Sequence, residues 1–331
     1  MIAAAALLAY AALLIGAAPV LARAHWPERA PRLAIAAWLA LAGSAIVSVV
    51  LAGLALLVPA PKVSHGIAWL LATCGMQLRA RYAHPGGPTL AVAGVSVAAA
   101  LVARLGWCAV ATLSATARAG RRHRLRLLLA SRPDERLGAL VVEHGEPVAY
   151  CMPGAGHPVV LTTAALRLLD DAQLAAVLAH ERAHQAGRHH LLVSLAAVPA
   201  AAFPGVPAFR YARDEVARLA ELAADDVAAA RSPRLAVAEA LLTLGEARAV
   251  PAAAWALGAG GSTAGDRVRR LIAAPNPLSR VASTAGALTV VALVALPLIL
   301  LAAPAFGTVG TSHRHPHGYH AHTLQGYPYT L

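Results

Sequence analysis

The stretch DDAQLAAVLAHERAH at residues 170–184 determines how the rest of the chain is interpreted. Asp170 stands where a helix N-cap would be, and Gln173 follows three residues later as its capping-box partner. Leucine and valine side chains then recur at helical spacing up to the HERAH segment. The pattern predicts one helix that carries two histidines and a glutamate near its C-terminal end.

The HERAH segment places metal-binding side chains on one helix face. His180 and His184 are four residues apart, so both imidazoles can reach a single metal ion. Glu181 then points to the side of that ion where a water molecule would bind, which is the physical content of the HExxH zinc pattern. The alternative is that both histidines are core or solvated residues of an arginine-flanked helix.

A second helical stretch, Arg218–Asp225, offers a third ligand. A catalytic zinc ion usually takes three protein ligands and leaves one position for water. Glu221 is suited to be the third ligand. Asp225, four residues later on the same face, can orient a ligand histidine by accepting a hydrogen bond from its free ring N–H. Glu215 is a rival ligand that lacks an acid four residues on, and Glu221 could instead pair with Arg218 on the surface.

Three short β-like runs precede the HERAH helix, at residues 140–143, 148–152 and 159–162. Glycines lie between them, as expected of turns. We therefore expect a small antiparallel sheet beside the helix, with an edge against which an extended peptide could pair. A merely structural sheet is the alternative.

The apolar composition indicates insertion into a membrane. The chain has 331 residues, of which 58% are hydrophobic and only 13% charged, whereas soluble domains carry roughly 25% charged residues. Apolar runs long enough to cross a bilayer cover residues 2–21, 33–58, 90–113 and 284–306. The first run lacks a positive n-region, so a retained span is preferred to a signal peptide, although residues 22–24 mimic a cleavage site.

The formal net charge of +12 comes almost entirely from arginine. The arginines cluster beside the apolar runs, so the positive-inside rule accounts for them and no direct nucleic-acid partner is expected. Six arginines between residues 118 and 132 form the strongest block, and four more precede the last run. Both blocks place residues 114–283 in the cytoplasm and the amino terminus outside.

Residues 191–209 form a further apolar stretch that three prolines interrupt. It could be a buried helix, a re-entrant hairpin or an interfacial element. We predict a segment that lies along the membrane rather than a full span. A full span would put the HERAH helix and the Glu221 helix on opposite sides of the bilayer.

The residues with metal chemistry also carry a family resemblance. HPVVLTTAALRLLDDAQLAAVLAHERAH at 157–184, followed by RLAELAADDVAA at 218–229, resembles the gluzincin membrane peptidases. These include the HtpX and CAAX-prenyl-protease branch and the BlaR/MecR-type branch. The resemblance covers roughly residues 148–272, with DRVRRLI near its end. It implies a zincin-like fold and one catalytic Zn²⁺, with His180, His184 and Glu221 as ligands and Glu181 as the catalytic base.

These observations together predict a mainly α membrane protein with an α+β zincin-like metallopeptidase domain. The expected division is a membrane domain with three transmembrane helices, a cytoplasmic zinc metallopeptidase domain, a final transmembrane helix and a His-rich tail, at residues 1–113, 114–283, 284–306 and 307–331. This layout is similar to the BlaR/MecR type, in which a BlaI-type repressor is inactivated. The penicillin-binding sensor domain of that branch has no counterpart after the last apolar run.

The expected partners are the lipid bilayer and a protein or peptide substrate, such as a BlaI-type repressor. The first alternative is a quality-control protease for membrane proteins, and the second is a non-enzymatic membrane sensor that retains a zinc site. The intact Glu181 argues against the sensor, because zinc binding alone does not need a base. Metal homeostasis is a third alternative, because five histidines lie in the tail, at 313, 315, 317, 320 and 322.

Other cysteines and histidines are not expected to bind the metal. The three cysteines, at 74, 108 and 151, are odd in number and widely spaced, which favours neither disulfides nor a thiolate zinc site. Cys151 is most simply a small buried hydrophobic residue. His189 and His190 directly follow the motif and are predicted at the helix surface or the membrane edge.

Overall fold

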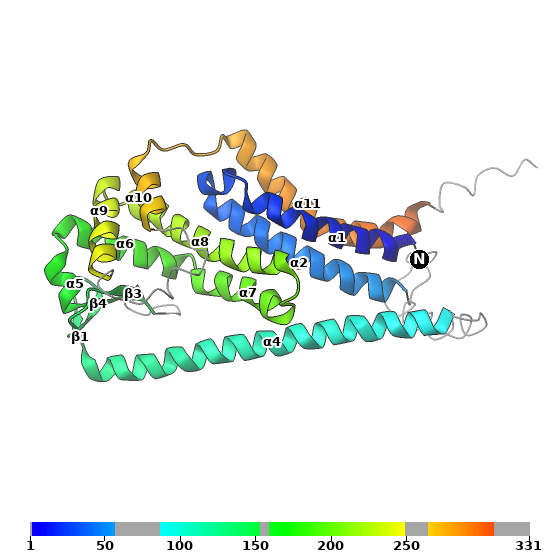
Figure 1. Cartoon of the computed structure of the whole chain (residues 1–331), viewed down its shortest axis with the longest axis horizontal. Coiled ribbons are helices and arrows are strands. Elements are labelled where there is room, and N and C mark those ends of the chain that lie inside the picture. The colour runs from blue at the N-terminus through cyan, green and yellow to red at the C-terminus, as the bar shows by residue number, and fades with distance from the viewer. Residues whose placement is uncertain (1, 57–86, 153–158, 249–263, 308–331) are drawn as a thin grey trace, which may run out of the picture.

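The computed structural model describes residues 2–56, 87–152, 159–248 and 264–307. Three long apolar helices, from residues 2–22, 31–55 and 280–307, lie together towards one end of the molecule, and a fourth, from residues 87–130, runs along its length (Figure 1). Shorter helices and a small sheet form the other end, which we call the compact end. The predicted His-rich tail beyond residue 307, the loop with Cys74 and the glycines at 154–156 lie outside the described residues.

Among the described residues, four helices are long and apolar enough to cross a membrane. They are α1 (Ile2–Ala22), α2 (Pro31–Ala55), α4 (Gly87–Ala130) and α11 (Arg280–Gly307), and each overlaps one of the four predicted runs. Helices α1, α2 and α11 pack together, with Trp38 of α2 fully buried. Helix α4 is 44 residues long and continues through the arginine block, since no proline interrupts it before the sheet.

The loop between α1 and α2 contacts the compact end of the molecule. It contains a short 3-10 helix, η1 (Trp26–Arg29). The Glu28 carboxylate lies 3.0 Å from Arg218, and the Glu28 carbonyl accepts hydrogen bonds from Arg270. Arg29 donates to the carbonyls of Asn276 and Pro277, just before α11. These contacts hold the loop between α1 and α2 against the compact end of the molecule.

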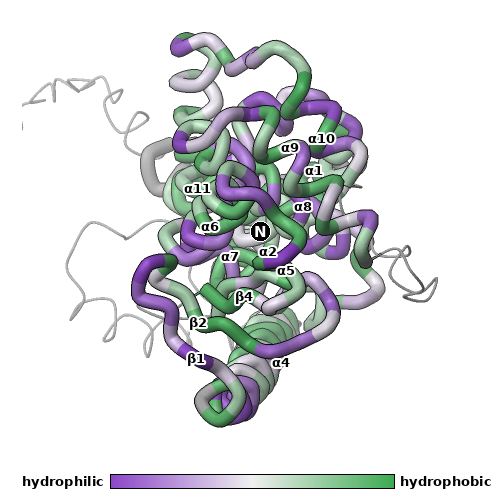
Figure 2. Tube along the Cα trace, turned by 90° about the vertical axis from the view of Figure 1, so that its left-hand side faces the viewer, coloured by the Kyte–Doolittle hydropathy of each residue, from purple (hydrophilic) through white to green (hydrophobic). Residues whose placement is uncertain are grey.

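The sheet has four short strands: β1 (Ser131–Asp134), β2 (Ala139–Val142), β3 (Ala149–Cys151) and β4 (Val159–Thr162). Their order is β1-β2-β4-β3, and β2 pairs with β4 in parallel, so the prediction of an antiparallel sheet was wrong. The reason is topological: β3 pairs with the far side of β4 instead of returning along β2. The polar strand β1 (Figure 2) was not predicted. It is an edge strand and contains Pro133, a residue that is tolerated at sheet edges.

The residues that the structure describes form six further helices: α5 (Thr163–Leu168), α6 (Asp171–Ala186), α7 (His189–Ala202), α8 (Pro207–Ala229), α9 (Arg234–Arg248) and α10 (Ala264–Ile272). Helix α6 begins with the predicted capping box, in which Asp170 accepts from the Gln173 amide at 2.8 Å. Its Val177 and Leu178 pack against the sheet, while Ala176 and Ala179 pack towards α9 and α10. Helix α6 is therefore held on two sides, which fixes its histidines in space.

The apolar stretch 191–209 forms α7 and the start of α8 rather than a single helix. Helix α7 has 14 residues, the chain turns at 203–206, and Pro207 begins α8. The start of α7 lies beside the arginine-rich part of α4, and Arg104 of α4 donates a hydrogen bond to the Ala202 carbonyl at its end. Helix α7 thus runs antiparallel to α4, and α8 runs back in the opposite direction to α7.

Candidate metal centre

Helix α6 brings its two motif histidines together. The Nε2 atoms of His180 and His184 lie 3.1 Å apart, and both side chains are largely buried. This is the consequence of their spacing, because residues four apart stand one turn apart on one helix face. Both rings face α8, which packs directly against α6.

Glu221 of α8 completes a group of three potential ligands. Its Oε2 lies 3.6 Å from His180 Nε2, and its Oε1 lies 3.5 Å from His184 Nε2. Ligands bound tetrahedrally to zinc at about 2.0–2.1 Å are separated by roughly 3.3 Å. The two nitrogens and the carboxylate therefore fit one zinc ion, and the part of the chain that the structure describes holds no other group of three such ligands.

Asp225 lies behind His180, one turn beyond Glu221. Its Oδ1 is 3.0 Å from His180 Nδ1, a distance that suits an ion pair, although this nitrogen has no well-directed hydrogen bond among the described residues. Asp225 is only 1% exposed, and Arg267 of α10 donates to both of its oxygens at 2.8 and 2.6 Å. The contact leaves His180 Nε2 directed towards the ligand group.

Arg267 joins the two carboxylates of α8. In addition to its contacts with Asp225, its guanidinium lies 3.0 Å from Glu221 Oε2. Burial opposes ionisation of both acids, yet His180 and Arg267 lower the pKa of Glu221 and that of Asp225 to about 2. Both acids are therefore charged at neutral pH. This pairing is possible because α10 packs beside α8.

His184 has a second histidine behind it. His189 is 6% exposed, and its Nδ1 lies 3.0 Å from His184 Nδ1. The prediction that His189 lies at the surface was wrong, because the chain turns sharply after α6 and Arg188 adopts a left-handed backbone conformation, with φ at 49°. The ring of His189 then lies against Gly187, where a Cβ atom would overlap it. His189 can thus orient His184 as Asp225 can orient His180.

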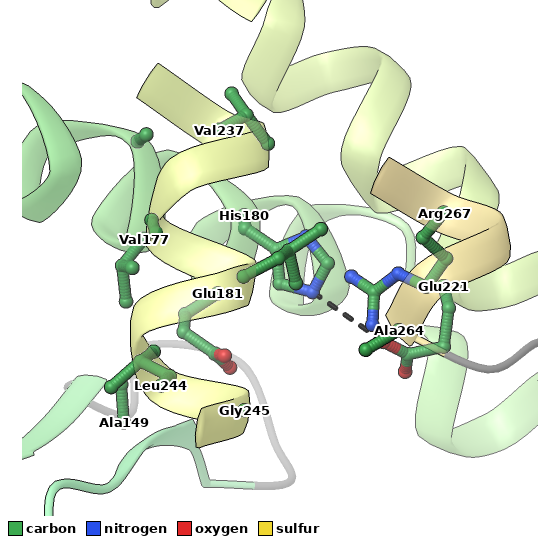
Figure 3. A pocket seen from close by; sticks show the side chains of 13 residues that line it. Ala149, Val177, His180, Glu181, Glu221, Val237, Leu244, Gly245, Ala264 and Arg267 are labelled. Carbon is green, nitrogen blue, oxygen red and sulfur yellow. Dashed lines mark ion pairs between the residues drawn. The ribbon is translucent and has the colours of Figure 1, made fainter. Parts of the chain in front are cut away.

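Glu181 points into the same pocket from α6, beside the sheet (Figure 3). Burial raises the pKa of its carboxyl group, and the nearby Glu221 adds to that rise. The thiol of Cys151, at the end of β3, forms a hydrogen bond with Glu181, and burial together with this carboxylate raises the pKa of Cys151 to about 12. Cys151 therefore stays a neutral thiol beside the proposed base.

The two histidines differ in protonation when no metal ion is bound. Burial would lower the pKa of His180, but the carboxylates of Asp225 and Glu221 outweigh it and raise that pKa to about 9. Burial lowers the pKa of His184 to about 4. A metal ion would have to displace the proton of His180, so metal binding should weaken as the pH falls.

A cavity of about 210 Å³ opens beside the ligand group. His180, Glu181, Glu221 and Arg267 contribute its polar atoms (Figure 3). Most of its remaining wall is apolar and comes from α6 and α9, through Ala176, Val177, Val237, Ala240, Leu241 and Leu244. The cavity can hold a side chain next to the atoms that would carry out the chemistry.

The structure brings together all five residues that the sequence singled out: His180, Glu181, His184, Glu221 and Asp225. The rival ligand Glu215 instead pairs with Arg218 at 2.9 Å. Among the ion pairs of the described residues, Arg218 contacts Glu28 and Glu215 but not Glu221. The sequence did not predict that Arg267, His189 and Cys151 contact the candidate centre. Of these three, only Arg267 could have been identified from the sequence, because it lies in the DRVRRLI segment that shares the family resemblance.

Comparison with known families agrees with this geometry. Residues 124–284 match the model of peptidase family M48. This M48 region covers a little under half of the chain, from the last turns of α4 to the start of α11, and includes every residue of the candidate centre. The match indicates a metalloprotease hydrolase. No curated protein and no solved structure matches the chain.

Proposed function

We propose that the chain is a membrane-embedded, zinc-dependent endopeptidase that cleaves protein substrates at the cytoplasmic face of the membrane. One observation carries the proposal. The nitrogens of His180 and His184 and the Glu221 carboxylate are spaced like the ligands of one zinc ion, and Glu181 points into the same pocket. The M48 match supports peptide hydrolysis as the reaction.

The chemistry divides between the metal ion and the chain. When bound, Zn²⁺ would polarise the scissile carbonyl and lower the pKa of a water molecule. Glu181 would accept the proton of that water and deliver it to the leaving amine. Burial of Glu181 helps, because a raised pKa makes its carboxylate a stronger base. His180, His184 and Glu221 would hold the ion, with Asp225 and His189 orienting the two rings.

Strand β3 supports binding of an extended peptide. It forms one edge of the sheet and ends at Cys151, which contacts Glu181. A substrate strand added to this edge would pass the proposed base with its backbone hydrogen-bonded to the sheet. The adjoining apolar cavity would take a substrate side chain, so we expect cleavage beside an apolar residue rather than a charged one.

Membrane insertion would follow from the four apolar helices and from the α7–α8 hairpin. Arg104 lies within the third candidate span and donates to the Ala202 carbonyl at the end of α7. Charged residues inside membranes are satisfied by such carbonyls. We infer that α7 enters the bilayer to the level of Arg104 and returns as α8. The metal centre, near the other end of α7, would then lie at the cytoplasmic surface.

The substrate could be a BlaI-type transcriptional repressor in a signalling pathway or a damaged membrane protein. The layout of three spans, a peptidase domain and one further span favours the repressor. Comparing cellular protein fragments between the wild type and an inactive variant would separate the two, since the repressor or membrane-protein fragments would vanish in the variant.

The variant Glu181→Gln tests the proposal in the purified full chain. We expect loss of casein hydrolysis, because the amide cannot accept the proton of the water molecule. One zinc ion per chain should be retained, because residue 181 is not one of the proposed metal ligands. Glu215→Gln is the matched control, since Glu215 pairs with Arg218 away from the centre; it should keep both activity and zinc. Activity of Glu181→Gln close to wild type would show the assignment to be wrong.

A further inference from the structure

A groove of about 410 Å³ lies between α4 and α7, apart from the metal centre. Arg121 and Arg124 of α4 lie along it on one helix face, together with His190 at the start of α7. Its apolar wall includes Leu113 of α4 and Leu191 of α7. None of the described residues that line the groove is acidic. Its chemistry suits a molecule with both an anionic and an apolar part.

The groove lies where the apolar surface of α4 gives way to the arginine block. Trp107, Val110 and Leu113 are exposed on α4, and the arginines begin five residues after Leu113. Across the groove, Leu191 and Leu195 of α7 are exposed as well. In a bilayer this junction, where the apolar surface meets the arginines, falls at the level of the headgroups.

We propose that this groove binds an anionic phospholipid, with its phosphate at Arg121 and Arg124 and its acyl chains along the apolar wall. Guanidinium groups match the oxygens of a phosphate geometrically, and two of them on one face can share one headgroup. Basic pockets between helices at the cytoplasmic face bind anionic headgroups in this way. The inference rests on the membrane insertion put forward in the proposed function. It does not depend on the hydrolytic activity.

A lipid in the groove would touch residues next to the metal centre. Met152 at the floor follows Cys151, which contacts Glu181, and His190 follows His189, which contacts His184. The lipid would also connect α4 to α7. We therefore expect the bound lipid to raise the thermal stability of the full chain.

The test compares two double variants with the same loss of charge. Arg121→Gln/Arg124→Gln removes the two groove arginines, whereas Arg118→Gln/Arg122→Gln removes two exposed arginines of the same block that are not among the lining residues of the groove. The full chain in phosphatidylcholine nanodiscs is titrated with phosphatidylglycerol, and bound lipid is counted by native mass spectrometry. We expect the groove variant to bind phosphatidylglycerol about thirtyfold more weakly, from about fivefold per arginine, and the control to change less than threefold.

Two outcomes would overturn the inference. Equal losses in both double variants would mean a diffuse attraction to the arginine block. Displacement of phosphatidylglycerol by millimolar inorganic phosphate would mean a site for free phosphate. Carbonate washing of vesicles that contain the chain separates this test from the proposed function: release of the chain would refute membrane insertion, whereas retention without lipid selectivity would refute the groove alone. Unchanged thermal unfolding of both variants in phosphatidylcholine serves as the folding control.

Discussion

At the scale of single residues, the candidate centre depends on partners behind its ligands as much as on the ligands. Asp225 contacts the inner nitrogen of His180, and His189 contacts that of His184. A histidine whose inner nitrogen is engaged presents its outer nitrogen to a metal ion in one orientation and one tautomer. The two ligand histidines are therefore oriented by different chemistry, a carboxylate for one and an imidazole for the other.

Gly187→Ala tests the orientation of His184. A Cβ atom at residue 187 would overlap the His189 ring, which is buried and cannot move away without losing its contact with His184. We expect zinc affinity to fall about tenfold or more, measured by competition with a chelator. Gly205→Ala is the control, because a Cβ atom there meets no atom within 4 Å. Wild-type affinity in both variants would mean that His189 does not orient His184.

At the scale of elements, α10 is joined to α8 through two arginines on one of its faces. Arg267 pairs with Asp225 and Glu221, and one turn later Arg270 pairs with Asp226 at 2.8 Å. Arg270 also donates to the Glu28 carbonyl in the loop between α1 and α2. The helix that contacts the metal centre is thus linked directly to the helices that would span the membrane.

Arg267→Met should destabilise the chain, because it leaves the buried Asp225 without its cation. Removing one partner of a buried ion pair costs about 3–5 kcal/mol, to be measured as the free energy of unfolding of the chelator-treated protein in detergent. Arg269→Met is the control on the same helix. Arg269 is 79% exposed and pairs with Asp266 on the surface, so the change should stay within about 0.5 kcal/mol. Equal losses in the free energy of unfolding of the two variants would contradict the structural role of Arg267.

At the scale of the whole molecule, the contacts of η1 join the loop between α1 and α2 to the elements that carry the candidate centre. Glu28 contacts Arg218 and Arg270, and Arg29 contacts the segment before α11. In the proposed membrane arrangement, this loop would therefore lie on the same side of the bilayer as the candidate metal centre. The arginine distribution independently favours the cytoplasm for this side.

A cysteine-labelling experiment checks this arrangement. In a chain whose three cysteines are replaced by serine, His25→Cys and Ser232→Cys introduce single thiols at η1 and after α8. Both should react with a membrane-impermeant maleimide in inverted vesicles and stay unlabelled in intact cells. Opposite behaviour of the two positions would contradict the arrangement of the helices, and labelling of both in intact cells would contradict the cytoplasmic placement.

Local spacing was enough to predict the metal-binding helix and the apolar runs. The capping box and the four-residue interval of HERAH act within α6 itself, and the length of an apolar run is a property of the sequence alone. The four-residue spacing of Glu221 and Asp225 likewise predicted that both carboxylates lie on one face of α8. These features need no knowledge of which elements become neighbours.

The tertiary structure decided what packs behind these residues. The parallel pairing of β2 with β4, the burial of His189 and the contact of Arg267 with Asp225 join segments whose relation no local pattern encodes. Arg267 lies 42 residues from Asp225 in the chain, and a turn in a left-handed conformation directs His189 inward. The sequence alone thus predicted the three residues that the structure places together as candidate ligands. Packing decided how the ligands are oriented, because orientation depends on contacts between elements distant in the chain.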